Sequence, residues 1–112
     1  MATVNVLFIN PPHQDLLEVP EPIDNQRLCN LIGVDRIDSR TLACDASTGA
    51  GDVILFDDAF LSKPELAGFT VRVPGGTPTR IAGKAVIVRC DAEGQYQTPV
   101  IDPRWIITFD KP

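Results

Sequence analysis

Turn-forming residues divide this chain of 112 residues into short apolar runs, and this division limits the folds it can adopt. The chain contains 10 prolines and 8 glycines, and many of them stand between runs rich in Val, Ile and Phe. Such runs are typical of β-strands. One further segment has helical spacing. The sequence therefore predicts an α+β fold, a mostly antiparallel sheet of five to seven strands with one short helix packed on it.

The predicted strands share a partly alternating apolar pattern and end at proline, glycine or an acidic residue. The first is Thr3–Ile9, and Asp15–Val19 is expected to return beside it as a hairpin partner. The stretch from Asp58 to Gly68 is predicted to be a loop with a helical turn. The remaining strands are expected at Val34–Cys44 with an interruption near Ser39, at Asp52–Asp57, at Phe69–Val73, within Ile81–Cys90 and at Trp105–Phe109.

The helix is predicted at Asn25–Ile32. Asp24 can cap its N terminus, and Gly33 can take the left-handed conformation that ends many helices. A helix of this length is marginal in water by itself, so we expect it to lean on the sheet. The predicted core is apolar and draws on both helix and strands: Val6, Phe8, Leu28, Ile32, Leu55, Val71, Val86, Val88, Ile106 and Phe109.

The composition is that of one globular domain, expected to span residues 1–112. A net charge of -5 argues against a nucleic-acid-binding protein, because phosphate backbones are held by clustered Lys and Arg. No apolar run approaches the length that crosses a membrane. The N-terminal residues fit a strand better than a signal peptide, and three cysteines do not make a secreted disulfide framework. A cytoplasmic protein is therefore expected.

Few residues could support catalysis. His13 is the single histidine, and its predicted loop should place it in solvent. Cys29, Cys44 and Cys90 are widely spaced and flanked by apolar residues, so they are expected to be core or half-buried side chains. We therefore predict a protein that is not an enzyme, with no cofactor.

Three carboxylates flank one predicted strand. Asp52, Asp57 and Asp58 could hold a divalent cation if Asp45 or Asp91 joined them, which would suit a metal-dependent enzyme. Acidic residues at strand ends are more often turn residues facing water. The favoured interpretation is therefore that no metal is bound.

The segment Val73–Lys84 could bind an anion. Adjacent glycines can expose backbone N–H groups, and threonine hydroxyls and basic side chains lie close by in sequence. It is not a P-loop, because Ala85 follows Lys84 where Ser or Thr would be needed. The alternative is an exposed turn with solvated basic side chains. The predicted ligand-binding residues are Arg72, Gly75, Gly76, Thr77, Arg80 and Lys84, with Thr79 and Arg89 nearby.

Four segments resemble a family of small uncharacterised proteins, a domain of unknown function encoded mostly by bacteriophages and plasmids. They are RLCNLIG running into VDRID, VILFDDAFL, IAGKAVIVRCDAEG and the final WIITF. Together they cover roughly Asn25 to Phe109. The resemblance implies the context of a mobile genetic element and supplies no catalytic residues.

The sequence is compatible with two functions. The first is a non-catalytic accessory protein of a phage or mobile element that binds a host protein through a sheet face or edge. The alternative is a protein that sequesters a small phosphorylated ligand or nucleotide signal with the Gly75–Arg80 loop. An exposed edge strand could also pair with a second copy, so a homodimer is a further expectation.

Overall fold

The computed structural model describes residues 3–20, 23–45, 47–59, 67–100 and 104–110. These residues form one helix and nine strands arranged in two sheets. The elements, in chain order, are β1 (Thr3–Asn10), β2 (His13–Pro20), α1 (Asn25–Ile32), β3 (Ile37–Cys44), β4 (Gly51–Asp57), β5 (Gly68–Arg72), β6 (Thr79–Ala82), β7 (Ala85–Cys90), β8 (Tyr96–Gln97) and β9 (Ile106–Phe109).

The large sheet has the strand order β2-β1-β7-β4-β3, and β8 pairs with the end of β7. Every pairing in it is antiparallel. The central strand, β7, buries four consecutive residues, Ala85 to Val88, because both of its faces are covered. Its edge strands among the described residues are β2 and β3.

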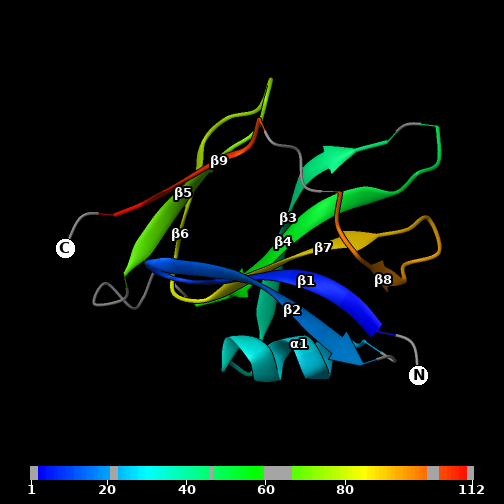
Figure 1. Ribbon diagram of the computed structural model, residues 1–112, viewed down its shortest axis with the longest axis horizontal. Coiled ribbons are helices and arrows are strands. Elements are labelled where there is room, and N and C mark those ends of the chain that lie inside the picture. Colours follow the sequence, from blue (N-terminus) through cyan, green and yellow to red (C-terminus); the bar gives the residue numbers. More distant parts are fainter. Residues whose placement is uncertain (1–2, 21–22, 46, 60–66, 101–103, 111–112) are drawn as a thin grey trace.

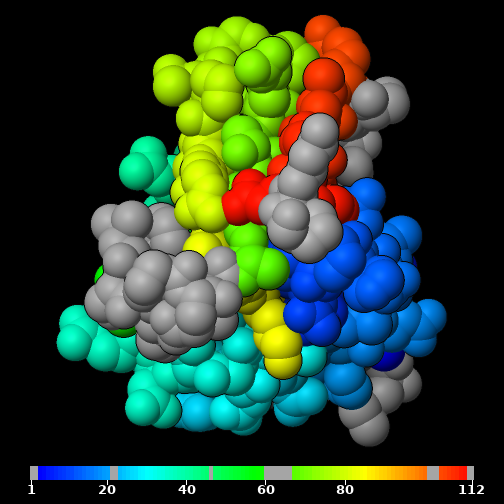
Figure 2. Space-filling model, turned by 90° about the vertical axis from the view of Figure 1, so that its left-hand side faces the viewer, coloured from blue at the N-terminus to red at the C-terminus, as the bar shows by residue number. Residues whose placement is uncertain are grey.

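The small sheet has the order β6-β5-β9 and is also antiparallel. It combines the β5–β6 hairpin, which precedes β7, with β9, the last of the described strands. Figure 1 shows α1 below the large sheet and the small sheet rising from its other side. In Figure 2 the small sheet, coloured from green-yellow to red, stands above the helix and the β1–β2 hairpin.

Two apolar clusters occupy the two faces of the large sheet, because side chains alternate along each strand. The inter-sheet core joins the two sheets and contains Leu7, Ile9, Ile54, Phe56, Phe69, Val71, Ile81, Ala85 and Ile87. The helix-side core lies under α1 and contains Val4, Val6, Val19, Leu28, Ile32, Leu55, Val86 and Val88.

The helix has the predicted bounds and the predicted ends. The Arg27 N–H donates to the Asp24 carboxylate at 2.9 Å, which caps the N terminus. Gly33 is left-handed at φ 81°, and its N–H donates to the carbonyl of Cys29 at 2.8 Å. Leu28 and Ile32 point into the helix-side core.

The α+β class and the mostly antiparallel pairing are confirmed. The segment Ile81–Cys90 is divided between two sheets, because Gly83 (φ 85°) turns the chain between β6 and β7. The predicted core residue Ile106 is wrong, since 54% of it is exposed on the outer face of the small sheet. The register shift in β3 lies between Thr41 and Ala43, beyond the predicted interruption at Ser39. The predicted helical turn after Asp58 falls mostly on residues 60–66, outside the described residues.

No helix in the described part of the chain is both long and apolar enough to cross a membrane.

Candidate binding groove

A groove of about 510 Å³ separates β3 from the β5–β6 hairpin. Val71 is buried in the inter-sheet core, and Leu42 and Val73 pack against that core, so these three side chains form an apolar floor. Charged and hydroxyl side chains make up the rim. The residues lining the groove are Asp38, Ser39, Arg40, Thr41, Leu42, Val71, Val73, Gly76, Thr77 and Thr79.

The register of β3 brings its two charged residues to this groove. Asp38 pairs with Phe56, and Arg40 pairs with Ile54. Residues directly opposite each other in a sheet project from the same face, and both partners belong to the inter-sheet core. Asp38 and Arg40 therefore project on the side of the large sheet that faces the small sheet.

The loop between β5 and β6, here called the glycine loop because it carries Gly75 and Gly76, lines the side of the groove opposite β3. Gly75 has φ 74°, a conformation that favours glycine, and the Gly76 N–H donates to the carbonyl of Val73 at 3.1 Å. A side chain at Gly76 would meet the Val73 Cγ2 atom at 2.6 Å. The loop therefore folds tightly on itself, and one of its N–H groups already has an acceptor. Gly76 and Thr77 are the predicted ligand-binding residues that reach the groove.

Arg72 and Arg80 lie on the opposite face of the small sheet. Arg80 pairs with Thr70, and Arg72 pairs with Ile106. Thr70 and Arg72 share a face, so the two arginines are diagonal neighbours there. The guanidinium of Arg80 forms an ion pair with Asp110.

Lys84 and Arg89 are also separated from the glycine loop. Lys84 follows β6 at the end remote from the loop and lines a second hollow of about 330 Å³ with Asp57. Arg89 lies on β7 and contacts Asp52, with 3.4 Å between Nη1 and Oδ1. The cation beside the loop is instead Arg40, which sequence reasoning missed. The sequence indicated that Arg40 lies on an alternating strand, but it did not indicate the register of that strand against β4.

Asp52 corrects the expectation that the acids beside β4 face water. It is 2% exposed, and its carboxylate accepts from the Val100 N–H at 3.2 Å as well as contacting Arg89. Burial raises the pKa of Asp52, and the Val100 N–H and Arg89 oppose that rise. The Asp52 carboxylate, on β4, therefore connects the large sheet to the segment after β8 through its hydrogen bond with Val100.

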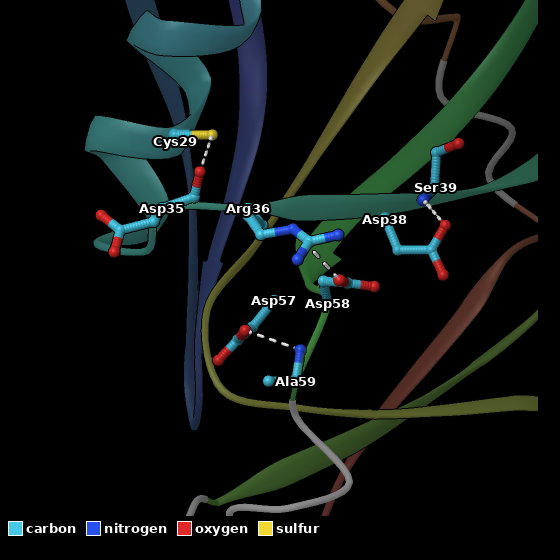
Figure 3. Close-up of polar contacts among 8 residues, drawn as sticks. All are labelled: Cys29, Asp35, Arg36, Asp38, Ser39, Asp57, Asp58 and Ala59. Atoms are coloured by element: carbon cyan, nitrogen blue, oxygen red, sulfur yellow. Dashed lines mark hydrogen bonds and ion pairs between the residues drawn. The ribbon is translucent and has the colours of Figure 1, made fainter.

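Asp57 is also buried, at 5% exposure, and accepts from the Ala59 N–H at 2.9 Å. Asp58 is exposed and contacts Arg36, with 3.7 Å between Oδ2 and Nε (Figure 3). These acids therefore serve a turn and a surface ion pair. In the described part of the chain, no cluster of three or more His, Cys, Asp or Glu side chains could hold a metal ion.

The remaining candidate residues lie on four different elements. His13 is exposed at the start of β2. Cys29 is buried in α1, Cys90 is half-buried, and Cys44 is exposed at the end of β3, where a core or half-buried position was expected. Cys44 is exposed because the outer end of an edge strand has few neighbours.

The chain matches no family model, no curated protein and no solved structure. The resemblance to a phage- and plasmid-encoded family therefore stays a prediction.

Proposed function

We propose that this protein is a non-catalytic binding protein that holds an extended segment of a partner protein in the groove between β3 and the β5–β6 hairpin. The observation that supports this most directly is the combination of an apolar floor with a polar rim at the edge of a sheet. Binding sites commonly pair apolar burial with a few polar groups that fix the orientation of the ligand.

The groove offers its occupant two kinds of contact. Leu42 and Val73, which are half-buried, can bury apolar side chains of the bound segment. Asp38 and Arg40 can pair with charges of opposite sign, and Thr77 and Thr79 can hydrogen-bond to its backbone. An extended segment suits this arrangement because alternate side chains would point toward the floor.

The test is a selection of random peptides on the purified protein, followed by affinity measurement on two variants. Thr77→Trp places a bulky ring on the groove wall, and Thr108→Trp places the same ring on an exposed strand position of the small sheet. Peptides that bind the wild type should bind Thr108→Trp equally and Thr77→Trp at least tenfold more weakly. Failure to enrich any peptide, or equal binding to both variants, would contradict the proposal.

A small phosphorylated ligand is the second candidate, since Arg40, Thr77 and Thr79 line one groove. Inorganic phosphate and a panel of nucleotides should then raise the melting temperature. A ligand at a hundred times its dissociation constant stabilises by about 2.7 kcal/mol. The Arg40→Gln variant should lose that rise, and a flat panel removes this candidate.

The partner in the first candidate is expected to be a host protein, in keeping with the predicted phage or plasmid origin. The residues proposed for its recognition are those that line the groove, and Arg72, Arg80 and Lys84 are not among them.

A further inference from the structure

The outer edge of β3 is an open edge of the large sheet among the described strands. β3 is eight residues long, and Asp38, Ser39, Arg40 and Thr41 are consecutively exposed. It pairs with β4 on one side, and no described strand lies on the other. The Ser39 N–H donates to the carboxylate of its neighbour Asp38 at 2.8 Å (Figure 3). A side-chain acceptor at this N–H indicates that it points away from β4 and toward the open edge.

The charges along this edge are complementary to themselves. We infer that β3 pairs antiparallel with β3 of a second copy of the chain, with Ser39 opposite Ser39. In this register Asp38 stands directly opposite Arg40 of the second copy, and the same pair forms again across the two-fold axis. Opposite charges at directly opposed positions stabilise a sheet, and like charges destabilise it.

The neighbouring registers are unfavourable. A two-fold axis perpendicular to the sheet places one residue opposite its own copy, so β3 can shift only in steps of two. Centring the pair on Asp38 opposes two aspartates and sets Arg36 against Arg40 of the second copy. Centring it on Arg40 opposes two arginines. Of these three centres, Ser39 is therefore the one that the charges favour.

The other edge of the large sheet does not suit a second copy. β2 carries Asp15 and Glu18 at exposed positions, and among its eight residues there is no Lys or Arg to oppose them. Self-pairing of β2 would gather four carboxylates at one interface. This cost favours β3 as the dimer edge.

The proposed pairing has a consequence for the shape of the dimer. A two-fold axis perpendicular to the sheet leaves both small sheets on one side of the joined sheet and both helices on the other. Because Asp38 and Arg40 also line the groove, the two grooves would adjoin across the axis. The inference does not depend on what the grooves bind.

Analytical ultracentrifugation of charge variants tests the inference. Asp38→Arg and Arg40→Asp each place like charges at both pairs, so each variant should dimerise at least tenfold more weakly than the wild type. An equimolar mixture of the two should recover dimers, because every opposed pair then has opposite charges. Asp15→Arg on β2 is the control and should dimerise like the wild type.

The competing outcomes are distinct. A wild type that remains monomeric at millimolar concentration would overturn the inference, because charged edge strands also serve to prevent pairing. Dimerisation unchanged in either single variant, or a mixture that fails to recover dimers, would overturn the register. Circular dichroism of each variant should match the wild type, since both positions are exposed. Peptide binding is tested separately, by comparing Thr77→Trp with Thr108→Trp. Failure of the proposed dimer can therefore be distinguished from failure of the proposed binding function.

Discussion

Asp52 is a buried carboxylate near the start of β4, with only 2% of its surface exposed. It stands at a strand end, next to a glycine, where a solvated carboxylate is expected. The structure buries it between Arg89 and the Val100 N–H. The environment of Asp52 is determined by the path of the chain after β8, which brings Val100 to it. That path depends on the pairing of β8 with β7.

The raised pKa of Asp52 predicts a pH-dependent loss of stability. Its folded-state pKa lies above the ordinary value of 3.8. At a pH between the ordinary and the folded-state pKa, the carboxyl is therefore mostly protonated in the folded state and mostly ionised in the unfolded state. The contribution of this group to stability is present below 3.8 and is lost as the pH rises through the folded-state pKa. The free energy of unfolding of the wild type, relative to Asp52→Asn, should therefore fall across that window. Urea titrations followed by Trp105 fluorescence measure it.

Asp45 provides the opposite case. Hydrogen bonds from the Ser47 hydroxyl and backbone N–H lower the pKa of Asp45 below 3.8. Its contribution is present above 3.8 and is lost as the pH falls through the lowered value. Relative to Asp45→Asn, the stability of the wild type should therefore rise with pH. Slopes of the same sign for the two comparisons would contradict the assignment of these environments.

At the scale of elements, the two sheets should differ in their tolerance of a methyl group. A Cβ at Gly51 in β4 would lie 2.7 Å from the carbonyl oxygen of Ala43, on the bulged part of β3. Backbone there cannot give way without disturbing the pairing. Gly51→Ala should therefore destabilise the protein by about 1–3 kcal/mol, a range typical of overpacking.

Gly68 in β5 is the matched control. A Cβ there would lie 2.6 Å from the Arg80 Nη2 atom and 2.9 Å from the Asp110 Oδ2 atom, which are ends of flexible side chains. Gly68→Ala should therefore displace the ion pair and cost less than about 1 kcal/mol, because exposed ion pairs contribute little. Urea denaturation compares the two variants. An equal or greater loss for Gly68→Ala would show that the small sheet cannot adjust.

Elements with local signals were predictable from the sequence. The helix has its predicted bounds because Asp24 and Gly33 determine its ends through contacts within a few residues. The β1–β2 hairpin was likewise expected from apolar runs on either side of two prolines. The short strands β6 and β8 were missed as separate strands, since four-residue and two-residue strands exist through pairing with distant partners.

At the scale of the whole molecule, the division into two sheets could not be deduced from the sequence. Apolar alternation shows that Val71 is buried, but not that it faces a second sheet. The residues of the candidate site were the hardest part to predict, because they come from both sheets. Gly76 and Thr77 were predicted correctly as neighbours in a loop, while their spatial neighbour Arg40 comes from a strand more than thirty residues earlier. Closeness in sequence wrongly suggested that Lys84 lies beside the loop. Lys84 instead follows Gly83 at the end of β6 that is remote from the loop.

The groove between β3 and the β5–β6 hairpin is the site at which we propose that a partner binds. The most direct measurement is amide chemical-shift mapping of the isotope-labelled protein on addition of a peptide enriched in the selection. The largest shifts should fall on Asp38–Leu42 and on Gly76, Thr77 and Thr79, with β2 and Thr108 unchanged. Shifts concentrated on β2 or on the outer face of the small sheet, with the groove amides unmoved, would contradict the account.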